Sequence, residues 1–187
     1  MIDTRFEPQK ATQVAHRFLA LSGGEMSYMR LIKLMYMADR KAYAELERPI
    51  TGDKYFSMDN GPVLSTVLNI IKDDSYIPPS EKSYWNKHIY KNAQYSVKIK
   101  SECDYDELSD SEIAIIDSIH EEFKGKDRWE VRNYCHEKLP EWKGPKGTSI
   151  RISPEEILSN VGKSSEEIEE IREELESVNY LKEILGA

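Results

Sequence analysis

The segment from Leu31 to Ser65, which reads LIKLMYMADRKAYAELERPITGDKYFSMDNGPVLS, constrains the fold more than any other part of the chain. Its first half carries an apolar stripe at the three- and four-residue spacing of an α-helix, formed by Leu31, Leu34, Met35 and Ala38. Other apolar residues widen the stripe, and we therefore expect a central helix that is buried on much of its circumference. The turn-forming sequence PITGD at 49–53 predicts where this helix has ended.

Three short stretches after this helix have the pattern of β-strands. Residues 54–58 are rich in aromatic side chains, and residues 84–90 and 95–99 look extended. We expect residues 91–93 to form a hairpin turn and the three stretches to make one small sheet. The sequence Asn60-Gly61-Pro62 predicts a turn followed by a helix, with glycine supplying a positive φ and Pro62 in the first helical turn.

Start signals predict the remaining helices. Pro8 suits the first turn of an opening helix, and Ser109 with Glu112 forms the pattern of a capping box. Residues 127–137 predict a helix with Trp129 among its buried residues, and Ser153 with Pro154 begins a short one. A second capping box at Ser164-x-x-Glu167 opens the last helix.

These elements predict a mainly α-helical fold. It would be a compact helical domain with a small antiparallel β-hairpin or three-stranded sheet, plus a C-terminal amphipathic helix. We expect the domain to span residues 1–162 and the acidic helix to span residues 163–187.

The distribution of charge limits the classes of partner. The chain has a net charge of −8, and residues 151–187 hold most of it, with four basic and ten acidic residues. An acidic segment opposes binding to a nucleic-acid backbone and favours a basic partner, or serves solubility alone. No stretch approaches the roughly 20 apolar residues of a membrane span, and the N-terminus lacks a signal pattern. We therefore expect a cytoplasmic protein without membrane contact.

The residues that most often carry catalysis or bind metals form no recognisable pattern. The four histidines lack HxxxH spacing, and Cys135 and His136 are helix neighbours that point about 100° apart. A catalytic Cys135 with a distant histidine is the remaining enzymatic interpretation. Asp39, Asp53 and Asp59 are candidate paired carboxylates for acid–base or metal chemistry, but an ion pair of Asp39 with Arg40 and a turn cap at Asp53 are the better explanation. We expect no enzymatic activity, no cofactor and no metal.

Two surfaces have more than one interpretation. Basic residues alternate with aromatic ones between residues 82 and 100, as on a strand that binds nucleic acid or on a solvated sheet face whose lysines protect an edge. The overall acidity favours the second interpretation. The last helix carries an apolar stripe that either packs on the domain or docks on a partner. Its residues are Ile168, Ile171, Leu175, Val178 and Leu181.

Three motifs occur together and in order. The first is Lys33-Leu34-Met35-Tyr36-Met37-Ala38-Asp39. The second is Arg48-Pro49-Ile50-Thr51-Gly52-Asp53, followed by Tyr55 and by Gly61-Pro62-Val63-Leu64-Ser65. The third is Trp129-Glu130-Val131, followed by His136 and Trp142. With these motifs, residues 8 to 162 resemble the Panacea domain, the SocA-like antitoxin domain of bacterial and phage toxin–antitoxin systems.

This resemblance implies an antitoxin that neutralises a cognate protein toxin by direct protein–protein contact. Family members are thought to act on very different toxins, the first-named member hands its toxin to an ATP-dependent protease, and related domains occur in prophage genes. The resemblance thus also allows a proteolytic adaptor or prophage regulator that delivers a bound client to a host protease. The motif positions expected to build the scaffold or to contact the partner are Tyr36, Asp39, Arg40, Asp53, Tyr55, Gly61, Pro62, Trp129 and His136.

Overall fold

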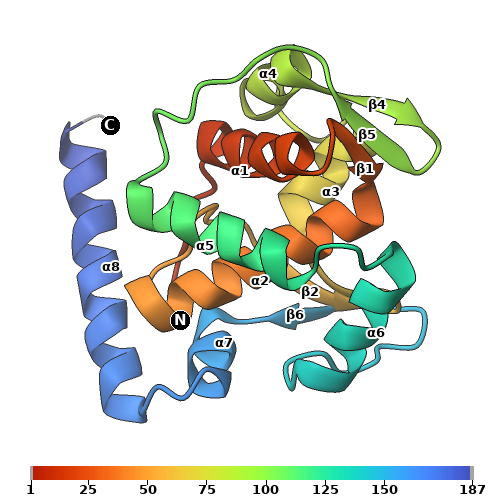
Figure 1. Cartoon of the computed structure of the whole chain (residues 1–187). Helices are drawn as coiled ribbons and strands as arrows, with labels where there is room; N and C mark the ends of the chain where they lie inside the picture. The colour runs from red at the N-terminus through yellow and green to blue at the C-terminus, as the bar shows by residue number, and fades with distance from the viewer. Residues whose placement is uncertain (1, 186–187) are drawn as a thin grey trace.

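The computed structural model describes residues 2–185 and contains eight helices and six short strands within them (Figure 1). The helices are α1 (Pro8–Leu21), α2 (Tyr28–Leu46), α3 (Ser65–Ile71), α4 (Pro79–His88), α5 (Asp110–Glu122), α6 (Arg128–Lys138), α7 (Pro154–Asn160) and α8 (Ser165–Leu185). The strands are β1 (Glu25–Ser27), β2 (Tyr55–Met58), β3 (Gly61–Leu64), β4 (Ile89–Ala93), β5 (Ser96–Ile99) and β6 (Ile150–Ile152). The predicted mainly α-helical class is confirmed.

Helix α2 runs through the middle of the molecule, as its widened apolar stripe predicts (Figure 1). Every residue from Leu31 to Asp39 is buried. The helix contacts α1, α5, α6 and α7, and also strand β3. A helix covered from several sides must be apolar around most of its circumference, and the polar residues it does carry must find partners inside the protein.

The strands form two three-stranded antiparallel sheets rather than the one sheet expected from sequence. The strand orders are β1-β5-β4 and β3-β2-β6. The β4–β5 hairpin is confirmed, but its turn lies at residues 94–95, and its third strand is β1. Strand β2 pairs instead with β3 and with β6, which comes from almost a hundred residues further along the chain. Pairing partners this far apart leave no local signal in the sequence.

Two other predicted elements take a different conformation. Most of residues 84–90 belong to helix α4, which buries Trp85 and His88. Pro62 does not open a helix, because it lies in β3 opposite Ser57, and α3 begins at Ser65. Strand β3 is an edge strand of its sheet, where a proline without an N–H group is tolerated.

Helix α8 stands along one side of the molecule and packs on it mainly through its first half (Figure 1). Ile171 is buried, and Ile168 and Leu175 are half-buried against the core. Further along the same helix, Val178 and Leu181 are 41% and 55% exposed. The predicted stripe therefore packs on the domain at one end and is open to solvent at the other. No helix within residues 2–185 has the length and apolar character needed to cross a membrane.

Candidate functional site

Asp39, the last residue of the first motif, joins helix α2 to the second motif. Its carboxylate accepts N–H bonds from Ile50 and Thr51 at 2.9 and 3.0 Å, and O–H bonds from Thr51 and Tyr55 at 2.5 and 2.9 Å. Burial raises the pKa of Asp39 to about 6, against the opposing effect of these donors. The predicted ion pair with Arg40 is wrong, because all four donors are neutral groups of Ile50, Thr51 and Tyr55. Arg40 pairs with Glu141 instead.

Glu141 makes a second buried junction on α2. Its Oε1 accepts hydrogen bonds from Tyr36 Oη at 2.9 Å and from Arg40 Nε at 2.7 Å, and Asn160 Nδ2 lies 3.3 Å from Oε2. The side chain of Glu141 is fully buried. Sequence analysis missed this residue, because it lies in an irregular connector where no periodic pattern separates buried from exposed positions. Glu141 holds this connector and the end of α7 against the central helix.

Asp53, at the end of the second motif, caps helix α3. Its carboxylate accepts N–H bonds from Thr66 and Val67, both at 2.9 Å, and from Lys54 at 2.6 Å. Two of these donors are first-turn groups that have no partner within the helix itself. Burial raises the pKa of Asp53, while the N–H donors oppose that effect. Asp53 is therefore a cap, as predicted, and the group that it caps is the first turn of helix α3.

Gly61 brings the backbone of β3 against a buried lysine. It has a φ of +99°, and a Cβ atom at this position would lie 3.0 Å from Lys33 Cε. Lys33 is buried and donates to Pro62 O at 2.7 Å. Burial lowers the pKa of Lys33 to about 8 and raises that of the nearby Cys135 thiol to about 11. A fully buried thiol that stays protonated at neutral pH is a poor nucleophile.

The third motif connects helix α6 to the end of strand β2. The rings of His136 and Trp142 are stacked, with centroids 3.7 Å apart and planes 8° from parallel. Trp142 Nε1 also donates to Met58 O at 2.8 Å. Trp129, however, is 43% exposed, and the prediction that it is buried is wrong. The guanidinium groups of Arg128 and Arg132 each lie 4.9 Å from its ring centroid, so its polar neighbours hold it at the surface.

The motif residues are thus mostly interior. Of the nine motif positions, which all lie within residues 2–185, Trp129 alone is exposed, while Arg40 and His136 are half-buried. Their role in partner contact stays a prediction. Their observed contacts tie the central helix to the segments packed around it, so these residues build the framework of the domain.

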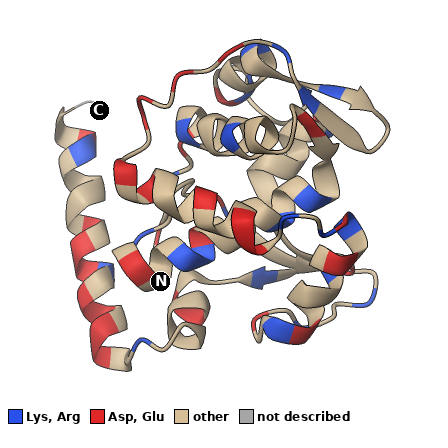
Figure 2. Cartoon of the chain, in the orientation of Figure 1, with Lys and Arg blue, Asp and Glu red and all other residues tan. Residues whose placement is uncertain are grey.

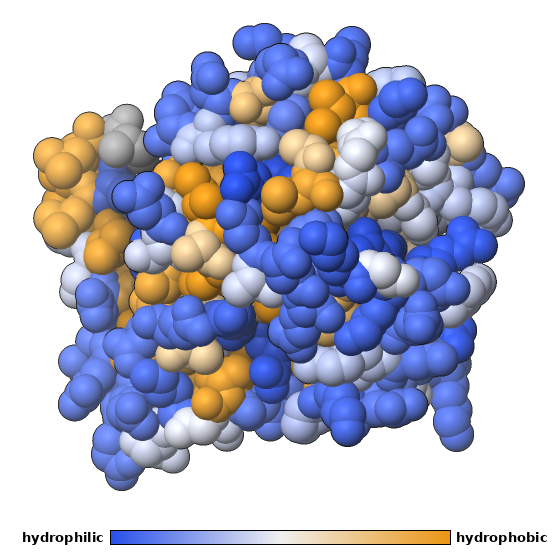
Figure 3. Space-filling view, in the orientation of Figure 1, coloured by the Kyte–Doolittle hydropathy of each residue, from blue (hydrophilic) through white to orange (hydrophobic). Residues whose placement is uncertain are grey.

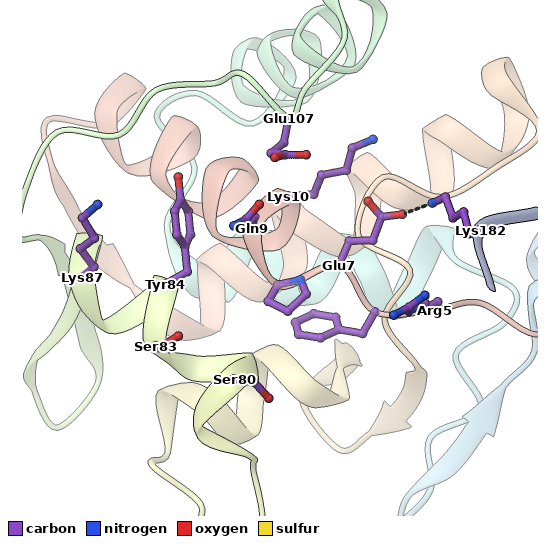
Figure 4. A pocket seen from close by; sticks show the side chains of 12 residues that line it. Arg5, Glu7, Gln9, Lys10, Ser80, Ser83, Tyr84, Lys87, Glu107 and Lys182 are labelled. Atoms are coloured by element: carbon purple, nitrogen blue, oxygen red, sulfur yellow. Dashed lines mark hydrogen bonds and ion pairs between the residues drawn. The ribbon is translucent and has the colours of Figure 1, made fainter. Parts of the chain in front are cut away.

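A recess of about 610 Å³ lies between the N-terminal segment, helix α4 and the end of α8 (Figure 4). The charged residues that line it are Arg5, Glu7, Lys10, Lys87, Glu107 and Lys182. Lys182 Nζ lies 2.8 Å from Glu7 Oε1, and this ion pair ties α8 to the N-terminal segment at one side of the recess. None of the nine motif positions and none of the five stripe residues of the last helix lines this recess. Within the described part of the chain, no group of three histidine, cysteine, aspartate or glutamate residues is placed to hold a metal ion.

Comparison with known proteins agrees with the motifs. A family model described as the antitoxin SocA-like Panacea domain matches residues 31–143, which is well over half of the chain. The match begins in α2 and ends just after Trp142, so it includes all three motifs and leaves α1, α7 and α8 outside. The resemblance drawn from sequence is confirmed over a shorter range than 8 to 162. No curated protein and no solved structure gives a significant match.

Proposed function

We propose that this chain, which belongs to the SocA-like Panacea antitoxin family, neutralises a cognate protein toxin by binding it directly. The observation that carries the proposal is the family match over residues 31–143. The chain would act in the cytoplasm by stoichiometric binding, without turnover, cofactor or metal. Neutralisation then depends on how much folded antitoxin is present relative to toxin.

The placement of the motif residues supports a binding module. Asp39, Glu141 and Asp53 are all buried and each accepts several hydrogen bonds, so these carboxylates serve the fold. Cys135 is buried and its pKa is raised by burial, which is opposite to the environment of an activated cysteine nucleophile. These environments favour a binding module over an enzyme.

Growth of a bacterial host tests the proposal. The gene adjacent to this one is expressed alone, with this chain, and with an Asp39→Ala variant, whose fold we expect to be destabilised. We expect arrest by the neighbouring gene product, relief by the wild-type chain and no relief by the variant. Co-purification of the two wild-type proteins then establishes direct binding. A harmless neighbour, or arrest that persists with the wild-type chain, contradicts the proposal.

A proteolytic adaptor or prophage regulator is the second candidate function. It is favoured by helix α8, which lies outside the family match and gives the chain a surface in addition to the shared domain. An adaptor needs two surfaces, one for the client and one for the host protease. The half-life of the toxin in cells, with and without the chain, separates the two functions. Faster loss of toxin that stops when residues 164–187 are deleted, while binding survives, supports the adaptor.

A further inference from the structure

Helix α8 carries a ridge of five residues that is exposed to solvent. We define the α8 ridge as Glu170, Glu174, Val178, Leu181 and Leu185, which follow one another at steps of three or four residues. Residues at these steps share one face of a helix. All five are exposed, and Val178, Leu181 and Leu185 are 41%, 55% and 76% exposed. The ridge is therefore acidic at one end and apolar at the other.

Other residues hold α8 on the domain, so the ridge is left available. Ile171 is buried in the core, Asn179 donates to Asp3 O at 2.9 Å, and Lys182 pairs with Glu7. Because these contacts use a neighbouring face of the helix, the ridge needs no rearrangement to become accessible. Figure 2 shows the acidic residues concentrated in the first half of α8, and Figure 3 shows hydrophobic side chains gathered at its C-terminal end.

The charges of the ridge are not neutralised within the described chain. Among the cations on α8 or just before it, Lys163 pairs with Glu47 and Glu167, Arg172 pairs with Glu169, and Lys182 pairs with Glu7. Within residues 2–185, no cation lies within ion-pair distance of Glu170 or Glu174. A partner that brings basic side chains to this end of the ridge meets no competing internal ion pair.

A second copy of the chain fits the ridge poorly. A parallel copy places Glu170 and Glu174 against the same two carboxylates, which repel one another. An antiparallel copy that overlaps the whole ridge places those carboxylates against Leu185 and Leu181, where they lose water without gaining a counter-charge. The occupant that fits both ends has basic residues beside an apolar surface.

We propose that the α8 ridge is the docking surface for the cognate toxin, and that the toxin meets it with a basic patch next to an apolar groove. This assignment rests on the proposed function and adds which surface is used. It also separates recognition from the shared domain, because α8 lies outside the range that the family model matches. The domain shared by the family then supplies the scaffold, and helix α8 supplies the specificity for the toxin.

The apolar end is tested by substitution with a matched control on the same helix. Leu181→Ser combined with Leu185→Ser removes apolar surface from the ridge. Tyr180→Ser is the control, because Tyr180 is 64% exposed and points about 100° away from its neighbour Leu181. With the purified product of the adjacent gene as the probe, we expect the double variant to weaken the Kd at least tenfold and the control to change it less than threefold. Both variants should melt like the wild type.

The acidic end is tested by reversal of charge. Glu170→Lys with Glu174→Lys places two positive charges on the ridge. Glu173→Lys with Glu176→Lys makes the same change of net charge on another side of α8, at exposed residues that also lie outside the ion pairs of the helix. We expect the ridge variant to weaken the Kd at least tenfold and to remove most of its dependence on salt, with less than a threefold effect in the control.

The outcomes distinguish the two proposals. Relief of growth arrest by the wild-type chain but not by the ridge variants supports both. If the ridge variants bind the toxin and relieve arrest as well as their controls, the toxin docks elsewhere and the ridge assignment is overturned, while the antitoxin function stands. If the wild-type chain fails to relieve arrest, the function itself fails and the ridge assignment fails with it. A change in the oligomeric mass of the ridge variants without toxin identifies a self-contact and also overturns the assignment.

Discussion

The junctions beneath α2 and the ridge of α8 both depend on carboxylates, but they use them in opposite environments. Asp39 and Glu141 are fully buried, and their oxygens accept hydrogen bonds from backbone and side-chain groups on neighbouring segments. Glu170 and Glu174 are exposed and lie beside apolar side chains that are exposed as well. Leaving a buried donor without its acceptor costs far more than altering a solvated charge. The same chemical group thus specifies the fold in one region and is left accessible to a partner in the other.

The largest expected effect comes from Asp39→Ala. The substitution leaves the N–H groups of Ile50 and Thr51 and the hydroxyl of Tyr55 buried without an acceptor. We expect the free energy of unfolding to fall by at least about 3 kcal/mol, measured by urea titration. Asp39→Asn keeps one acceptor oxygen and should lose less. An unchanged unfolding midpoint in the alanine variant would contradict the contrast between the two regions, because the hydrogen bonds of Asp39 would then not stabilise the fold.

The next effect concerns pH and the buried Lys33. Burial lowers its pKa from 10.5 to about 8, so the unfolded state binds more protons between these two pH values. The free energy of unfolding therefore rises with pH in this window, and the wild type should gain about 2 kcal/mol over Lys33→Met between pH 7 and pH 9.5. Urea titrations of both proteins at the two pH values measure this gain. Parallel pH profiles would show that Lys33 is solvated.

A smaller effect is expected from Asp53→Ala, which removes the cap of α3. The loss of this cap should cost about 1–2 kcal/mol in a thermal or urea melt. Because Asp53 is buried, neutralisation of the toxin should fall only as far as the folded fraction falls. Asp53→Ser retains a capping oxygen and serves as the control. Lost neutralisation with an unchanged melting curve would instead place Asp53 in the interface with the toxin. Buried carboxylates would then contribute to partner binding as well as the α8 ridge.

The smallest effect is expected from Trp129→Ala, which tests the exposed motif residue. Its contacts with the guanidinium groups of Arg128 and Arg132 are at the surface, so the free energy of unfolding should fall by no more than about 1 kcal/mol. Neutralisation should be retained, since we place toxin docking on α8. A variant that melts normally and fails in the growth assay would show that α6 also contacts the toxin.

Local signals were enough to predict several elements. Ser109 and Glu112 make the expected reciprocal capping box of α5, and Ser153 caps α7 with Pro154 after it. The central position of α2 followed from an apolar stripe too wide for a surface helix. The strand predictions were less accurate, because β2 pairs with β6 and β5 pairs with β1, and such pairings depend on residues that are distant in the chain.

The candidate site shows the same division. The motifs identified Asp39, Arg40 and Asp53 as important positions, but the sequence did not indicate which group each one binds. No sequence pattern identified Glu141, although it accepts hydrogen bonds from Tyr36 and Arg40. The apolar stripe of α8 was visible in the sequence, whereas its change from packed to exposed became visible only when the helix was placed against the domain.

The amino-acid sequence by itself determined the helical class of this protein, several of its helix starts and its family. Those features depend on residues within a few positions of one another, where periodicity and capping act. The tertiary structure alone decided that the motif carboxylates face inward and that the α8 ridge faces outward. Tyr36 and Glu141 are 105 residues apart in the chain. Whether such a charge is buried with partners or left in water depends on which distant segments fold over it, and only the packed molecule decides that.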